Sequence, residues 1–380
     1  MIAYPEQALY NSCVLTEARE EFNNSNISAE SFQKIEQAYQ SKLYTPNFFI
    51  AIALGLLTLV AVIFTTFLFY LLTNAGISSR LAVLCLLMTV LCYVSLEGII
   101  KKKMFFNAGV DNALMILVLL FIMGFFLSYF ENPSWLGING TLMLVSLWLS
   151  IRFTDSFMAM VSGAFFFVLS YLLYERSGAT SLIFFSLVMM LLIAGMYAVI
   201  NKIKKQVNCI YEKCIQVLTI FLLIAFYTSG NYWVINELQL AELSHPLPVS
   251  FGWIFWVFTF VIPFVYIFYG IIKKDVLHIR TGVFLVMMSV LTYKYYFNLF
   301  PVEFEMLFVG IILVTICYFL IKWLQKAKYG FIAEMITPQP SWRNIEALVI
   351  AETMGGSEAP QKDSLFQGGS SGGAGASGEF

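Results

Sequence analysis

The sequence predicts an all-α fold, a polytopic bundle of about ten transmembrane helices. Three observations lead to this prediction. Hydrophobic residues make up 59% of the 380 residues and charged residues only 12%. Because soluble domains carry about 25% charged residues, lipid must solvate much of this chain. Apolar stretches long enough to span a bilayer then follow one another between residues 47 and 323, and Lys and Arg gather in alternate connections between them.

Residues 1–46 are mostly polar and predict a small cytoplasmic helical module. Pro5 suits the first turn of a helix. The apolar face of that helix comprises Leu9, Val14, Ala18 and Phe22. A turn is expected at residues 23–26, and Ser28 can cap a second amphipathic helix. The module is therefore expected to be a helical hairpin.

The transmembrane domain is predicted to occupy residues 47–323. Its ten spans are expected at about 47–72, 79–98, 112–130, 137–151, 155–174, 179–200, 211–229, 250–272, 279–298 and 303–323. The fourth is short, and residues 132–137 blur its start. If this segment failed to cross, every later span would be inverted, so the topology needs an independent test.

The distribution of Lys and Arg supplies that test. With ten spans and a cytoplasmic start, the external connections hold three basic residues, Arg80, Arg176 and Lys294. The cytoplasmic connections hold sixteen, which are Lys34, Lys42, Lys101, Lys102, Lys103, Arg152, Lys202, Lys204, Lys205, Lys213, Lys273, Lys274, Arg280, Lys322, Lys326 and Lys328. Because cytoplasmic loops are enriched in Lys and Arg, this split supports ten spans with both termini in the cytoplasm.

The C-terminal part is predicted to lie in the cytoplasm. Residues 324–366 are expected to contain one short helix after Ser341, with a short strand as the competing interpretation. Residues 367–380 form a flexible Gly/Ser-rich tail. Its end, Glu379 and Phe380, is a candidate peptide ligand for a cytoplasmic partner. Alternatively, residues 365–368 are close to a protease cleavage sequence, and the tail would then be a fusion scar without function.

A group of polar residues is expected at the outer rim, where the ninth and tenth spans meet. A hairpin through Pro301 would bring Lys294 close to Glu303, Glu305 or both. One interpretation is a polar site that binds an anion, a headgroup or a proton. The other is an ion pair within an interfacial aromatic belt, with Lys294 extended toward water.

Pro263 lies in the middle of the eighth span. It should leave the carbonyl of Thr259 without its helical partner and kink the helix, so it is a possible hinge or only a packing feature. Small residues four positions apart are expected to seat close helix contacts: Ala159 with Gly163, and Ala194 with Ala198.

Ionisable residues are scarce inside the spans, and those present lie close to the cytoplasmic surface. Glu97 precedes a run of three lysines, and Asp111 begins the third span. Arg152 and Asp155 flank a tight turn and are expected to pair with each other. These groups therefore predict interfacial contacts and no site near the middle of the membrane.

Several function classes are disfavoured. No nucleophile-elbow, metalloprotease or nucleotide-binding motif occurs, which predicts no catalytic residues and no cofactor. Six cysteines without a CxxC motif and only two histidines predict no metal site. A net charge of −1 argues against nucleic acid as a partner. Membrane lipids are expected partners, together with cytoplasmic or membrane proteins.

The start of the chain carries a resemblance. The segment Asn26-Ile27-Ser28-Ala29-Glu30, with Ile35 and Tyr39 after it, leads into the apolar residues 50–57. This arrangement resembles the start of large bacterial inner-membrane families described as domains of unknown function. The Gly/Ser-rich end resembles the tails of TPM-domain membrane proteins, although this chain has no such domain. The resemblance implies a location in the bacterial inner membrane and no known activity.

Two functional hypotheses follow. The first is a non-enzymatic membrane scaffold, or a component of an envelope complex, that binds partners through its cytoplasmic ends. The second is a transporter or channel for a lipid-like or weakly polar solute, which the number of spans, Pro263 and the outer-rim group would serve.

Overall fold

The computed structural model describes residues 2–23, 27–73, 78–177, 182–204, 209–242 and 251–297, together with nine positions between 304 and 322. Internal contacts divide the chain into two units, residues 1–336 and 337–380, and every described residue belongs to the first. The predicted segments 324–366 and 367–380, including Glu379 and Phe380, lie outside the described residues.

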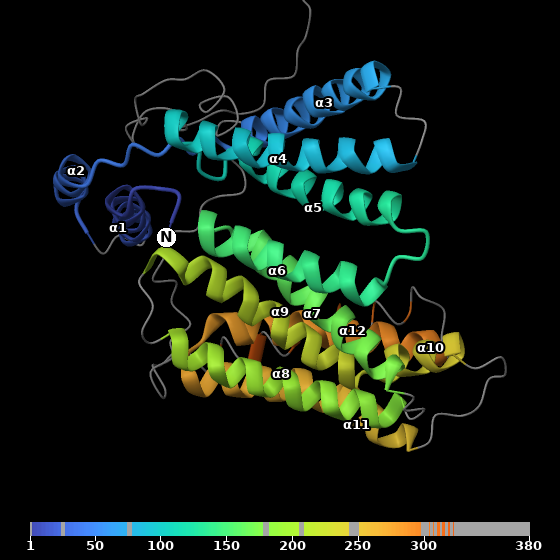
Figure 1. Ribbon diagram of the computed structural model, residues 1–380. Helices are drawn as coiled ribbons and strands as arrows, with labels where there is room; N and C mark the ends of the chain where they lie inside the picture. Colours follow the sequence, from blue (N-terminus) through green and yellow to red (C-terminus); the bar gives the residue numbers. More distant parts are fainter. Residues whose placement is uncertain are drawn as a thin grey trace, which may run out of the picture. The chain divides into compact units, whose positions relative to one another are not determined.

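The described part of the chain is α-helical and contains no β-strand beyond an isolated bridge between Tyr44 and Phe105. Its helices are α1 (Glu6–Asn23), α2 (Ala29–Ala38), α3 (Phe48–Thr73), α4 (Ser78–Lys103), α5 (Val110–Tyr129), α6 (Trp135–Phe153), α7 (Ser156–Arg176), α8 (Leu182–Lys204), α9 (Glu212–Gly230), α10 (Tyr232–Glu242), α11 (Gly252–Lys273) and α12 (Val276–Tyr296), with a 3-10 turn at Cys209–Tyr211. The all-α prediction is confirmed (Figure 1).

Within the described residues, nine helices are long and apolar enough to cross a membrane: α3 to α9, α11 and α12. The uncertain fourth span is one of them, because α6 is a continuous helix of 19 residues. It starts two residues earlier than expected, since Ser134 Oγ caps it by accepting a hydrogen bond of 3.4 Å from the N–H of Gly137. The predicted tenth span, 303–323, lies largely outside the described residues, although its described positions are helical.

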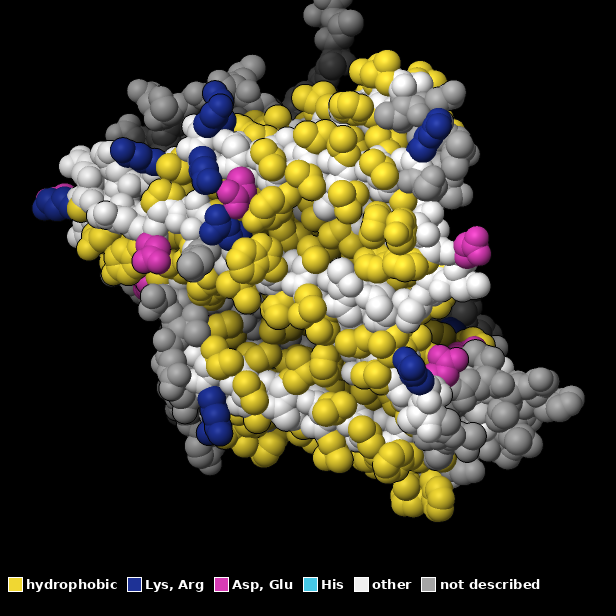
Figure 2. Space-filling model, in the orientation of Figure 1, with side chains coloured by type: hydrophobic (Ala, Val, Ile, Leu, Met, Phe, Trp, Pro, Cys, Tyr) yellow, Lys and Arg dark blue, Asp and Glu magenta, His cyan; other side chains and the backbone are white. Residues whose placement is uncertain are grey.

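Consecutive spans pack as antiparallel hairpins, α4 with α5, α6 with α7, α8 with α9, and α11 with α12 (Figure 1). This pairing brings the basic ends of α4, α6, α8 and α11 to one end of the bundle, which we call the basic end. Arg80, Arg176 and Lys294 lie at the opposite end. Figure 2 shows hydrophobic side chains spread between these ends, as expected for a surface that contacts lipid.

The N-terminal residues form the predicted helical hairpin. Ser28 caps α2 by accepting a hydrogen bond of 3.2 Å from the N–H of Ser31, and Phe22 of α1 stacks on Phe32 of α2 with ring centroids 5.1 Å apart. The hairpin also packs on the bundle, because Tyr4 and Leu9 are buried in the same hydrophobic cluster as residues of α4 to α7. The hairpin and the spans therefore share a continuous core.

The hydrophobic core has two centres. One lies among α4, α5, α6 and the start of α7, and smaller clusters lie among α8, α9, α11 and α12. Position 109, just before α5, requires a glycine because the backbone of α3 passes close to it. Its φ of +83° favours glycine, and a Cβ there would lie 1.9 Å from the carbonyl oxygen of Ala51.

The expected pairing of Arg152 with Asp155 is wrong. Arg152 Nη2 instead donates to Glu97 Oε1 of α4 at 2.8 Å, and Lys101 lies 3.0 Å from the other carboxylate oxygen. Asp155 is the N-cap of α7, where its Oδ1 accepts a hydrogen bond of 2.6 Å from the N–H of Met158. The capping position orients Asp155 toward the helix it begins, while Arg152 reaches across to the neighbouring hairpin.

Candidate functional site

The outer-rim group predicted from the sequence is only partly described. Lys294 lies in the last turn of α12 and is half-buried. Glu303 and Glu305 lie outside the described residues, so a Lys294–Glu303/Glu305 site stays a prediction.

Pro263 is buried inside α11, and the helix continues on both sides of it. The neighbouring helix α12 approaches closely here through Gly282. A Cβ at position 282 would lie 2.7 Å from Cγ1 of Ile267 and 3.0 Å from the carbonyl oxygen of Pro263. This geometry is a packing contact between α11 and α12, and a hinge at Pro263 stays a prediction.

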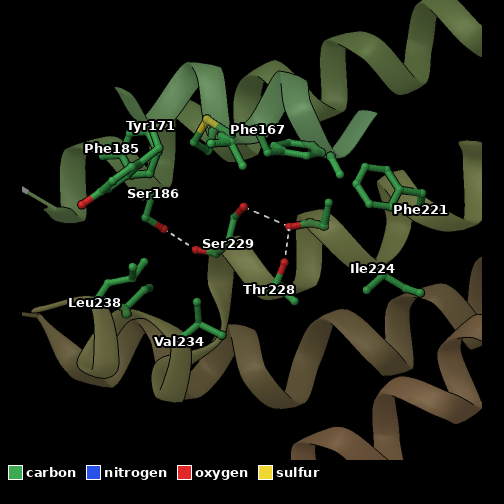
Figure 3. A pocket seen from close by; sticks show the side chains of 15 residues that line it. Phe167, Tyr171, Phe185, Ser186, Phe221, Ile224, Thr228, Ser229, Val234 and Leu238 are labelled. Carbon is green, nitrogen blue, oxygen red and sulfur yellow. Dashed lines mark hydrogen bonds between the residues drawn. The ribbon is translucent and has the colours of Figure 1, made fainter. Parts of the chain in front are cut away.

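The structure adds a cavity that the sequence did not predict. It has a volume of about 510 Å³ and lies among α7, α8, α9 and α10 (Figure 3). Its walls are largely aromatic and aliphatic, with Phe167, Tyr171, Phe185 and Phe221 among them. No charged side chain belongs to the described residues that line it. We call this space the α7–α10 cavity.

The hydroxyl groups in the wall of this cavity bind the backbone of α9. Thr228 Oγ1 and Ser229 Oγ each donate to the carbonyl oxygen of Ala225 at 2.9 Å, and Ser186 of α8 donates to the carbonyl oxygen of Ser229 (Figure 3). Their protons are therefore engaged, and each hydroxyl oxygen keeps acceptor capacity. These three side chains can contact an apolar molecule without leaving a polar hydrogen unpaired, and they offer weak acceptors to a molecule with one polar group.

A small residue of α7 allows a close approach to Phe221, which lines the cavity. Gly163 of α7 faces the ring of Phe221 on α9, where a Cβ at position 163 would lie 2.8 Å from Cε1 of the ring. The close contact that the Ala159 and Gly163 spacing predicted therefore occurs, between α7 and α9. Phe167 of α7, which lines the cavity, packs on the same ring of Phe221 with ring centroids 5.5 Å apart.

The short helix α10 contributes Val234, Ile235 and Leu238 to the cavity wall and follows a buried asparagine, Asn231. The Asn231 side chain accepts a hydrogen bond of 2.9 Å from the N–H of Trp233 and donates to Tyr227 Oη at 2.9 Å and to Thr292 Oγ1 at 3.2 Å. It thereby ties the α9–α10 turn to α12. The predicted spans at 211–229 and 250–272 left residues 230–249 as a connection between them, and α10 was not anticipated.

A second cavity, of about 340 Å³, lies on the other side of the α9–α10 turn, toward α12. It shares Ile224, Thr228 and Val234 with the α7–α10 cavity, so these three side chains form the wall between the two spaces. Asn231 and Thr292 are among the polar side chains that line the second cavity. The two cavities together could hold the apolar and the polar parts of one molecule.

Two buried carboxylates lie at the basic end. Asp111 and Asp155 are 2% and 5% exposed, and Oδ1 of Asp111 has no hydrogen-bond partner among the described residues. Burial, with a smaller contribution from the neighbouring carboxylate of Asp111, raises the pKa of Asp155 to about 6, against the lowering effect of the Met158 N–H. The sequence predicted that these groups make interfacial contacts; both are in fact buried inside the protein at the basic end.

Hydropathy could not reveal the α7–α10 cavity, because its walls combine residues from four helices whose packing the sequence does not state. The only local signal was the cluster of small and hydroxyl residues at the end of α9, Thr228-Ser229-Gly230. Within the described residues, no group of three or more His, Cys, Asp or Glu side chains is arranged to hold a metal ion. No protein-family model, no curated protein and no solved structure matches this chain.

Proposed function

We propose that this integral membrane protein binds a lipid-like or weakly polar molecule in the α7–α10 cavity and acts as a non-enzymatic transporter or channel for it. The observation that carries the proposal is a cavity of about 510 Å³ with apolar and aromatic walls, inside a multi-span helix bundle. Its volume falls within the range of roughly 300–1,000 Å³ that small-molecule sites occupy.

The lining selects the class of occupant. A charged molecule would lose its hydration without meeting a counter-charge in the wall, and the cost of that exchange is high. An apolar chain would instead contact the rings of Phe167, Phe185 and Phe221. A carbonyl or hydroxyl on the same molecule could reach the polar side chains of the neighbouring cavity, Asn231 and Thr292. The proposed solute is therefore amphipathic with a small uncharged head.

Photolabelling can test this proposal. The purified protein, in nanodiscs, is irradiated with an aliphatic alcohol that carries a diazirine in its chain, and the modified peptides are identified by mass spectrometry. Labelling is expected to concentrate on the segments of α7, α8, α9 and α10 that line the cavity. Labelling spread evenly over the lipid-facing surfaces of all spans would contradict the proposal.

A matched pair of variants sharpens the test. Ala164 lines the cavity and is exposed, so Ala164→Trp should occupy the space and reduce labelling of the cavity peptides severalfold. Ala198 of α8 is also exposed but lines none of the cavities described above, so Ala198→Trp adds the same side chain elsewhere and should leave labelling unchanged. Equal labelling in both variants would argue against an occupied cavity.

The second candidate function is a membrane scaffold or a component of an envelope complex. The observation that favours it is α2, which has no buried residue and stands on the outside of the N-terminal hairpin at the basic end. Its surface carries polar and charged side chains, including the Lys34–Glu30 ion pair at 2.6 Å. A stoichiometric partner that co-purifies in mild detergent and is lost when α2 is replaced would support this function, and its absence would count against it.

We further propose that the protein resides in a bacterial inner membrane with the basic end in the cytoplasm. The excess of Lys and Arg at that end supports this orientation. A reporter active only in the cytoplasm should be active when fused before α1 and inactive when inserted into the connection after α10. The opposite pattern would overturn the orientation.

A further inference from the structure

A buried histidine lies at the basic end of α12, where this helix packs beside α11. Its Nδ1 lies 2.9 Å from Oδ2 of Asp275, and its Nε2 lies 2.7 Å from Oη of Tyr197 on α8. The side chain of His278 is 5% exposed, whereas that of Asp275 is 30% exposed. A hydrogen-bonded chain therefore leads from a carboxylate in contact with solvent to a partly buried phenol.

Local sequence explains this placement. Asp275 is the N-cap of α12, and its Oδ1 accepts a hydrogen bond of 3.0 Å from the N–H of Leu277. The spacing of three residues places His278 one turn later on the same face, so the second carboxylate oxygen can reach its ring. The cap thus fixes the carboxylate, and the carboxylate fixes the orientation of the imidazole.

Tyrosine rings surround the imidazole. The ring of Tyr269 lies 5.0 Å from that of His278, and the rings of Tyr197 and Tyr266 lie 5.8 Å and 6.5 Å away. The same four side chains line a cavity of about 270 Å³. The residues that α9 contributes to this cavity are Leu222, Leu223 and Phe226, so the titratable groups that face His278 come from α8, α11 and the α11–α12 turn.

The hydrogen bonds of His278 differ between its two protonation states. An ionised Asp275 only accepts hydrogen bonds, so Nδ1 carries a proton and the neutral ring accepts from the Tyr197 O–H at Nε2. When Nε2 takes up a proton from water, the new N–H donates to Tyr197 Oη, and the phenolic proton must turn elsewhere. Tyr197 also lies within hydrogen-bonding range of Asn201 and of Tyr269, and Tyr269 lines the same cavity.

We propose that the cavity beside His278 binds a weakly polar molecule through an acceptor oxygen, and that proton uptake by His278 strengthens this binding by turning the Tyr197 hydroxyl toward the cavity. One N–H bond forms at Nε2 with a proton from solvent, and it breaks when the proton returns. The imidazolium faces the Asp275 carboxylate and the surrounding tyrosine rings, which stabilise a cation. This site is separate from the α7–α10 cavity and does not depend on it.

Histidine NMR tests the hydrogen-bond reversal. The chain has two histidines, His245 and His278, so in His245→Gln all ¹⁵N-histidine signals come from His278. At alkaline pH the ring should be the Nδ1–H tautomer, and acidification should add the second N–H. Tyr197→Phe should change the Nε2 resonance and leave Nδ1 bonded to Asp275. An Nε2–H tautomer, or a ring that never takes up a proton between pH 5 and 9, would overturn the proposal.

Ligand binding tests the coupling. The probe is an aliphatic methyl ketone that carries a diazirine, and the readout is labelling of the α8 and α11 peptides that line this cavity. One hydrogen bond is worth about 0.5–1.5 kcal/mol net, so labelling should rise by about two- to tenfold from pH 8 to pH 5.5. His278→Gln keeps a hydrogen-bonding side chain without titrating, and its labelling should not change with pH.

Tyr211→Phe is the matched control, because the Tyr211 hydroxyl donates to the carbonyl oxygen of Ile151 at 3.0 Å and this side chain lines none of the cavities described above. This variant should keep the pH dependence of the unmodified protein. A pH dependence that persists in His278→Gln, or that is lost in Tyr211→Phe, would refute the assigned role of His278. Labelling of α7 and α10 peptides reports on the α7–α10 cavity alone, and labelling of α11 peptides on the cavity beside His278 alone, so the two proposals can fail separately.

Discussion

The N-cap of α7, Asp155, should make the protein less stable as the pH rises. Its pKa is raised from 3.8 to about 6 in the folded protein, mainly by burial. The folded state therefore holds the proton more tightly than the unfolded chain does, and the stabilising contribution of protonated Asp155 is present below pH 4 and lost as the pH passes through 6. A difference of about 2 pH units corresponds to about 3 kcal/mol in the free energy of unfolding.

Asp155→Asn isolates this contribution, because asparagine caps a helix as well as aspartate does and carries no charge. Compared with the unmodified protein, the variant should be equally stable near pH 4 and more stable by about 3 kcal/mol near pH 8. Unfolding in mixed detergent micelles, followed by circular dichroism at several pH values, measures the difference. The effect of the nearby Asp111, which is 2% exposed, is already included in this figure.

Asp275→Asn is the matched control, since Asp275 also caps a helix but its side chain is 30% exposed and bonded to His278. Removal of this charge should cost stability and not add to it. The reasoning about Asp155 would be refuted if Asp155→Asn were less stable than the unmodified protein at pH 8. It would also be refuted if the difference between the two proteins did not change with pH.

Three further predictions test the packing. The Cys13 thiol lies within hydrogen-bonding range of Cys209, so a mild oxidant should join them by an intramolecular disulfide, visible as altered gel mobility. Burial and the contact with Cys209 raise the Cys13 pKa to about 12, so Cys13 should react slowly with alkylating reagents at pH 8. Gly109→Ala should abolish the folded yield in size-exclusion chromatography, since its Cβ would lie 1.9 Å from the Ala51 carbonyl oxygen. Ser134→Ala should lower the free energy of unfolding by about 1 kcal/mol through loss of the α6 cap.

The spans were predictable because each depends on a local property of the chain. A stretch of about 20 apolar residues bounded by polar ones has few alternatives to a membrane helix, and nine of the ten predicted spans correspond to described helices. Boundaries differed by a few residues where a cap decides them, as Ser134 does for α6. Lys101 to Lys103 extend α4 beyond its predicted end, because long basic side chains can leave the apolar region while their backbone stays helical.

The contacts between helices were not predictable in the same way. Arg152 is three residues from Asp155 yet pairs with Glu97, 55 positions earlier, because long side chains of α4 and α6 meet at the basic end. The α7–α10 cavity and the bond between Tyr197 and His278 likewise depend on how separate helices pack. Hydropathy does not distinguish His278 from an isolated polar residue. The separation of three residues between Asp275 and His278 was a signal that could have indicated a capped helix and an oriented ring.

An electron cryomicroscopy structure of the protein in lipid nanodiscs tests the central claim most directly. The account predicts elongated density in the α7–α10 cavity, bordered by the rings of Phe167 and Phe221 and by Thr228 at the end of α9. In Ala164→Trp this density should be replaced by the indole ring. A bundle in which α7, α8, α9 and α10 pack without any space between these side chains would contradict the account.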